Sequence, residues 1–229
     1  MIEHLLLPKK HISWTQLDLW NTNPERYKRE TFEGGKKLDT KFLRFGKGIA
    51  ELMEEIAKNP ALLTDKMWML EKFDLDIDSW EGQRFVEDLK FYDTPEHEIR
   101  TEVAGVPCLS FLDSWDSITT NFREYKTGKI PWTQAKVQKH DQLVFYATML
   151  KWKTGKIPEY CDLDWLETKE TVTETSDFWR QSDKIVKVTG RIVSFHREFD
   201  EREIERMEQL IIRTATEISE AYIKFINSI

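Results

Sequence analysis

The sequence predicts an α/β domain with a central mixed β-sheet flanked by helices. Three observations lead to this fold class: apolar residues at helical spacing before residue 60, strand-like segments between residues 99 and 199, and a long amphipathic segment at the C-terminus. A chain of 229 residues is long for one small domain and short for two. We expect a single domain over 1–229, mainly helical over 1–95, with the sheet over 96–199 and a C-terminal helix over 200–229.

Two short helices are expected near the N-terminus. Ser13 followed by Gln16 has the pattern of a capping box and predicts a helix through Trp20. Asn23 followed by Pro24 predicts a second helix, because asparagine caps helices well and proline suits the first helical position.

A longer helix is predicted from Asp39 to about Asn59. Its apolar residues fall on one face at helical spacing: Phe42, Phe45, Ile49, Leu52, Met53 and Ile56. Residues 61–95 are expected to hold two short helices separated by acidic turns.

The pattern changes to strands at about residue 99. Residues 99–115 and 120–127 are expected to be strands with a turn between them, and residues 161–168 and 185–199 are expected to be later strands. A helix is expected over residues 133–152. This order of strands and helices is typical of a mixed sheet covered by helices.

Asp200 with Glu203 predicts the start of the last helix. Its apolar residues form a stripe that alternates spacings of three and four, which indicates either a core-facing helix or a helix that packs on a second copy of the chain in a homo-oligomer. The stripe consists of Ile204, Met207, Ile211, Thr214, Ile218, Ala221 and Phe225.

The charge is acidic overall and basic in one stretch. A net charge of −7 argues against nucleic acid as a partner when it is taken alone, since contacts to phosphates drive that binding. Residues 126–156, however, hold seven Lys and one acid, Asp141. Such a strip can bind a phosphate backbone, or it can be an ordinary solvated helix face.

The two cysteines, Cys108 and Cys161, predict a reduced intracellular protein and are too few for a four-thiolate iron–sulfur or zinc site. The chain begins with an apolar run of only three Leu before Pro8, which is too short for a signal peptide or a membrane span. We therefore expect a cytoplasmic protein that does not enter a membrane.

Asp113, Glu124 and Lys126 form the candidate catalytic group. Glu124 and Lys126 are two residues apart on one predicted strand, so their side chains share a face. A symmetric turn centred between Ile118 and Thr119 would pair residues whose numbers sum to 237, which places Asp113 beside Glu124.

Two adjacent carboxylates repel each other unless they share a cation or a proton, and hard oxygen ligands suit Mg²⁺ or Mn²⁺. A metal ion held by Asp113 and Glu124 could activate water toward a phosphodiester, with the backbone carbonyl of Tyr125 as a further ligand and Lys126 beside the developing charge. The plainer alternative is a surface strand pair with a cross-strand salt bridge.

Five segments in order resemble the RecB-like branch of the PD-(D/E)XK nuclease superfamily, including its CRISPR-associated and phage exonuclease members. They are SWTQLDLWNTNPERYKRE, FGKGIAELME, VAGVPCLSFLDSWDS, REYKTGK and DQLVFYATML, within residues 12–150. The family has a restriction-endonuclease-like core, and the resemblance assigns Asp113, Glu124 and Lys126 to its catalytic motif.

The resemblance implies a metal-dependent DNA nuclease, with an exonuclease in recombination, repair or phage DNA metabolism as the family's usual form. It places Gln142 and Tyr146 at the border of the site. Lys129 and Lys136 are candidate phosphate contacts, and solvated surface lysines are the alternative. The expected partner is DNA, as linear ends or single strands, with a helicase or recombination protein as a further candidate.

Two departures from the family stand out. Most relatives carry a His or Glu metal ligand at the position of Ala50, which leaves Glu51, Glu54 or Glu102 as candidate replacements. This loss also motivates the alternative of a catalytically inactive relative that binds nucleic acid or a partner protein. The iron–sulfur members carry a cysteine at the position of Asn23, and their C-terminal cysteines are missing here too, so no cluster is expected.

Overall fold

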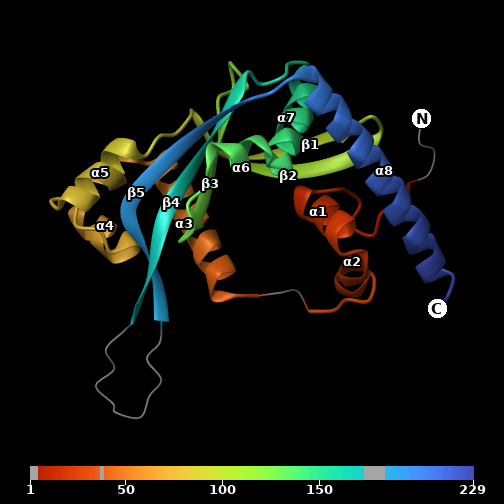
Figure 1. The fold of residues 1–229 in the computed structure, drawn as a ribbon, viewed down its shortest axis with the longest axis horizontal. Coiled ribbons are helices and arrows are strands. Elements are labelled where there is room, and N and C mark those ends of the chain that lie inside the picture. The colour runs from red at the N-terminus through yellow and green to blue at the C-terminus, as the bar shows by residue number, and fades with distance from the viewer. Residues whose placement is uncertain (1–4, 37–38, 173–183) are drawn as a thin grey trace, which may run out of the picture.

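The computed structural model describes residues 5–36, 39–172 and 184–229 and has the expected α/β fold (Figure 1). Within these residues one sheet has its strands in the order β1-β2-β3-β4-β5. The β3–β4 pair is parallel and the other neighbours are antiparallel, so the sheet is mixed as predicted. The strands are β1 (Thr94–Val103), β2 (Val106–Trp115), β3 (Phe122–Gly128), β4 (Tyr160–Val172) and β5 (Lys184–Glu198).

Helices lie at both ends of the sheet. In Figure 1, α4 and α5 lie beside β5 at the left, α3 lies near β3, and α1, α2 and α8 gather at the right. The helices are α1 (Trp14–Thr22), α2 (Pro24–Thr31), α3 (Lys41–Lys58), the 3₁₀ helix η1 (Pro60–Thr64), α4 (Lys66–Phe73), α5 (Trp80–Asp88), α6 (Gln134–Gln138), α7 (Asp141–Thr154) and α8 (Glu201–Ile226). None of these helices is long and apolar enough to cross a membrane.

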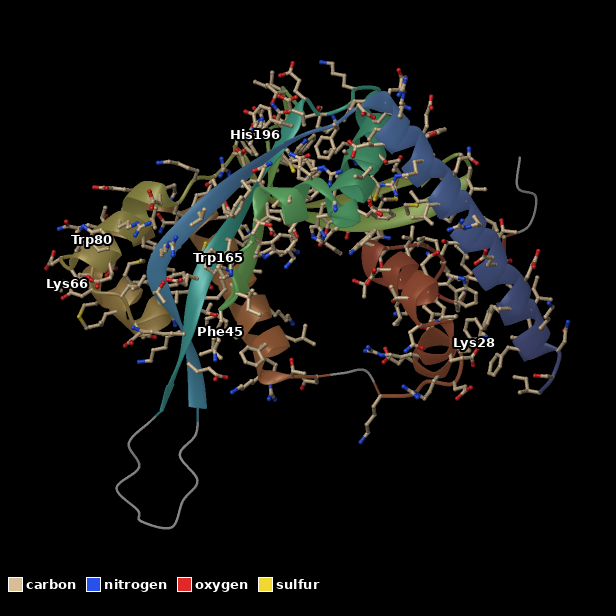
Figure 2. All side chains as sticks on the ribbon, viewed as in Figure 1. Lys28, Phe45, Lys66, Trp80, Trp165 and His196 are labelled. Carbon is tan, nitrogen blue, oxygen red and sulfur yellow. The ribbon has the colours of Figure 1, made fainter. Side chains whose placement is uncertain are left out.

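Two apolar clusters form the core. The first joins α1, α2, α6, α7 and α8 to β1, β2, the start of β3 and part of β4, and the second joins α3, α4 and α5 to parts of β3, β4 and β5. Trp165 of β4 belongs to the first cluster and Phe45 of α3 packs against the second, and Figure 2 labels both. Strand β3 contributes to both clusters, because Phe122 packs in the first and Tyr125 in the second.

The C-terminal stripe is part of the core. Ile204, Met207, Ile211 and Ile218 are buried, which favours the core-facing interpretation over the oligomer for this part of the helix. The predicted capping box of Asp200 and Glu203 is present. The one predicted at Ser13 is absent: Ser13 is the N-cap of α1, but its side chain makes no capping hydrogen bond.

Two predicted elements are each divided. Residues 99–115 are not one strand, because Ala104 and Gly105 turn the chain with φ of 50° and 86° and make β1 and β2 a hairpin. Two positive φ angles are the geometry of a tight hairpin turn. The helix predicted over 133–152 is broken at Lys139–His140 into α6 and α7.

A buried arginine holds this break in place. The Arg197 guanidinium donates hydrogen bonds to the carbonyls of Val137 (3.2 Å) and His140 (2.8 Å) and to the Glu203 carboxylate (2.7 Å). Arg197 is only 1% exposed. The start of α7 is therefore fixed to β5 and to the first turn of α8.

Candidate active site

The site lies where β2 and β3 separate. The ladder between them contains only Ser114↔Arg123 and Trp115↔Phe122, and both pairs sum to 237, as the sequence predicted. One position further, Asp113 and Glu124 are neighbours, but the Asp113 carboxylate accepts a hydrogen bond from the Tyr125 N–H at 2.7 Å in place of a backbone bond. The side chain of Asp113 thereby fills the opening between the diverging strands.

Glu124, Lys126, Gln142 and Tyr146 form one hydrogen-bonded network. The Lys126 ammonium donates to Glu124 Oε1 at 2.5 Å and to Gln142 Oε1 at 3.0 Å. The Gln142 amide donates to the same Glu124 oxygen at 3.2 Å and to the Tyr146 hydroxyl at 2.6 Å. The structure thus brings Glu124 and Lys126 together with Gln142 and Tyr146 of α7, and Asp113 lies next to Glu124.

The second oxygen of Glu124 has a different environment. Glu124 is 4% exposed, and its Oε2 atom is buried without a hydrogen-bond partner among the described residues. A buried carboxylate oxygen without a donor or cation is costly, so this atom calls for either a proton shared with Asp113 or a bound cation.

Charge and burial oppose each other at the site. Burial and the adjacent Glu124 charge raise the pKa of Asp113 well above its usual value, against the opposing effects of the Tyr125 N–H and Lys126. For Lys126, burial lowers the pKa, but Glu124 and Asp113 outweigh it and the pKa is raised. Lys126 is therefore a cation and hydrogen-bond donor at neutral pH, which makes it unsuitable as a general base.

A cavity of about 510 Å³ opens onto this group. Asp113, Glu124 and Lys126 line it from the sheet, and α3 supplies the opposite wall, including Gly46 and Ala50. A Cβ atom on Gly46 would lie 3.5 Å from Thr127 Oγ1, so α3 passes close to β3 here. Ala50, the position at which the sequence resemblance led us to expect a metal ligand, thus lines the cavity, and its side chain is a methyl group.

The candidate replacement acids are not among the residues that line this cavity. Glu51 is exposed and lies 3.6 Å from Lys47. Glu54 forms an ion pair with Lys58. Glu102 lines a different pocket, beside Arg100 and Lys10.

The two candidate phosphate-binding lysines also have local partners. Lys129 pairs with Glu170 at 2.6 Å. Lys136 lies 3.9 Å from the centre of the Trp132 ring. Neither lines the cavity, so their contact with phosphate stays a prediction.

His140 is a site neighbour that the sequence analysis missed. It is half-buried, its ring lies 4.9 Å from that of Trp132, and its Nε2 atom is buried without a partner in the described chain. Burial and the charge of Lys126 lower its pKa to about 4. Its position at the N-cap of α7 depends on the helix break, which no local signal in the sequence predicted.

The donor set fits a hard divalent cation. No three His, Cys, Asp or Glu side chains gather as a metal site in the described part of the chain. Mg²⁺ commonly binds through one or two carboxylates and keeps several waters, so Asp113 and Glu124 suffice in number. The raised pKa of Asp113 is that of two carboxylates in one buried site, which must share either a proton or a cation.

Comparisons with known proteins show the fold. No family model matches the chain, and no curated protein matches it. A solved structure named "Putative exonuclease", from Eubacterium rectale, aligns with a TM-score of 0.50 at 12% identity, covering 92% of this chain and 83% of that chain. The crystal structure of SSO0001 aligns with a TM-score of 0.40 at 12% identity, over 93% of this chain and 79% of that chain.

Proposed function

We propose that this protein is a metal-dependent nuclease that hydrolyses phosphodiester bonds in DNA. The observation that carries the proposal is the convergence of Asp113, Glu124 and Lys126 on one cavity, with a buried Glu124 oxygen that has no hydrogen-bond partner among the described residues. The fold shared with a protein named as an exonuclease supports it. By the habits of the family that the sequence resembles, the activity is exonucleolytic and serves recombination, repair or phage DNA metabolism.

Each residue has a distinct role in this proposal. Asp113 and Glu124 hold Mg²⁺ or Mn²⁺, which when bound supplies Lewis acidity and a lowered pKa of water. Lys126 donates to the negative charge that develops on the phosphate. Gln142 orients both Lys126 and Glu124, and Tyr146 orients Gln142.

The test is a cleavage time course on end-labelled linear DNA, single- and double-stranded, in Mg²⁺, Mn²⁺ or EDTA. Wild-type protein should release label only with a divalent ion, and the kinetics of release should show the polarity. Lys126→Ala should lose at least about a hundredfold, the usual effect of removing a group that stabilises transition-state charge. Cleavage that persists in EDTA, or equally in Lys126→Ala, would contradict the proposal.

Ala50 favours a second candidate, an inactive nuclease fold that binds nucleic acid. The methyl group of Ala50 faces the cavity where relatives place a ligand. Glu124→Ala distinguishes the two functions, because a nuclease loses cleavage whereas a binding protein keeps or improves its affinity on losing a negative charge. DNA binding without cleavage in any metal would favour the second candidate.

A further inference from the structure

A groove between α2 and the end of α8 lies outside the candidate active site. It has a volume of about 540 Å³, similar to that of the catalytic cavity, and none of the candidate catalytic residues lines it. In Figure 1 the end of α8 lies beside α2 at the right, and Figure 2 labels Lys28 of α2. The proposed nuclease reaction does not use this groove.

The groove has the composition of a protein–protein interface. Trp20 is buried, Phe32 and Phe225 are half-buried, and the ring centres of the last two lie 5.5 Å apart. The charged side chains that line the same groove are Lys28, Glu33, Glu217, Glu220 and Lys224. Aromatic side chains at the centre and charged ones around them are the usual arrangement where two proteins meet.

The apolar stripe of α8 continues past the part that the core covers. Ile211 and Ile218 are fully buried, whereas Ala221 and Phe225, the last two members of the stripe, are half-buried and line the groove. The sequence left open whether the stripe packs on the core or on a second copy of the chain, and the core accounts only for its first part. The last turns of α8 therefore fit the second alternative.

The charges on this face of α8 complement themselves. Glu217, Ala221, Lys224 and Ser228 follow one another at spacings of four, three and four, so they share a face, and Glu220 borders it. Two acids thus precede one base along the helix. If a second α8 packs antiparallel on the first, the two-fold axis places each Lys224 beside the two acids of the other copy. The small side chains of Ala221 and Ser228 allow the helices to approach closely.

Glu220 and Lys224 are not paired within the described chain. A spacing of four with Glu first is the one that favours an ion pair along a helix. The ion pairs that α8 makes with described residues involve other positions, and neither of these two side chains takes part in one. Both charges can therefore pair across an interface.

We propose that this protein forms a two-fold symmetric homodimer in which the groove between α2 and α8 of each copy receives the α8 of the other. The rings of Phe32 and Phe225 pack at the centre, and Lys224 pairs with the glutamates of the second copy. A partner of a single charge sign would be repelled by part of the groove, whereas a second copy satisfies both signs. The dimer does not depend on the proposed function, because no candidate catalytic residue takes part in it.

Charge reversals test the dimer without disturbing the fold. Lys224→Glu and Glu220→Lys each place like charges across the two-fold axis, and the double variant restores opposite charges. Both positions are exposed, so the Tm of each variant should stay close to that of the wild type. Lys156→Glu is the control, because it makes the same change of net charge as Lys224→Glu in the turn after α7, outside the groove.

The measurement is sedimentation velocity over a series of protein concentrations at low salt, which gives the Kd of the dimer. Wild-type protein should pass from monomer to dimer as its concentration rises, and added salt should weaken the dimer. Each single reversal should raise the Kd about tenfold or more, because like charges that face each other in an interface are costly. The double variant should return to within about threefold of the wild-type Kd, and Lys156→Glu should keep it.

Two results would overturn the proposal. One is wild-type protein that sediments as a monomer at every concentration up to about 0.5 mM, which is also the result expected if the groove binds a different protein. The other is a dimer whose Kd responds equally to Lys224→Glu and Lys156→Glu, because such a dimer forms through another surface or responds only to net charge.

Discussion

Glu124 is the residue on which the contacts of the candidate site converge. Oε1 accepts hydrogen bonds from Lys126 and Gln142, whereas Oε2 has no donor within the part of the chain that the structure describes. This division fixes the carboxylate while it leaves one oxygen for a ligand. Residues that orient a metal-binding carboxylate matter nearly as much as the carboxylate itself.

Gln142→Leu should therefore lower kcat by about 10- to 100-fold, because it removes the amide that holds Glu124, Lys126 and Tyr146. The matched control is Gln138→Leu on α6, whose amide lies 3.4 Å from the His196 carbonyl, outside the network. Steady-state cleavage of a labelled strand at saturating Mn²⁺ measures both. Equal rates for the two variants would show that Gln142 is a packing residue only.

His140 provides a pH test at the same scale. Its pKa is lowered to about 4 by burial and Lys126, so the unfolded chain binds a proton at higher pH than the folded chain does. The sign follows from linkage: stability is complete above the unfolded pKa of about 6.5 and is lost as pH falls from there toward 4.

His140→Gln should remove this loss. Relative to wild type, the variant should gain stability between pH 6.5 and 4, by up to a few kcal/mol at the lower end, and should show no such gain at pH 8. Urea unfolding at a series of pH values gives the difference directly. A difference that does not change with pH would mean that His140 titrates normally in the folded protein.

At the scale of elements, the break between α6 and α7 decides where the α7 residues lie. The sequence predicted one helix over 133–152, because no Gly or Pro within this range marks an interruption. The interruption depends on tertiary contacts from Arg197, 57 residues further along the chain, which local periodicity does not contain. The β2–β3 register was predictable for the opposite reason, since a short turn fixes the pairing of adjacent strands.

Arg197→Met should destabilise the fold by on the order of 3 kcal/mol, because it removes the buried guanidinium that donates to the carbonyls of Val137 and His140 and leaves the Glu203 carboxylate without its cationic partner. Arg206→Met is the control, because Arg206 also ties α8 to α7, through Asp141, but is half-exposed. An exposed pair of this kind contributes about 1 kcal/mol or less. Similar losses in urea unfolding would show that burial of Arg197 adds nothing.

At the scale of the molecule, the site lies at the junction of the two apolar clusters. Tyr125 packs in the second cluster and Tyr146 in the first, while the residues between them carry the charges. The mixed sheet and the proximity of Asp113, Glu124 and Lys126 could be predicted because they depend on periodicity and on neighbours in sequence. The pocket of about 470 Å³ between α1, β2 and α7 could not, because these elements are distant in sequence and leave no shared pattern.

A site between two clusters couples metal binding to the stability of the whole fold. Without a cation the Asp113–Glu124 pair opposes folding through repulsion and burial, so an ion bound only by the native state should raise the Tm. At a hundred times its Kd, Mn²⁺ should raise the Tm by about 5–10 °C in a domain of this size. Glu124→Gln should abolish the rise, and Asp78→Asn, which removes an exposed acid in the turn before α5, should keep it. Thermal unfolding in EDTA and in a Mn²⁺ series tests this without cleavage, and an equal rise in all three proteins would place the ion elsewhere.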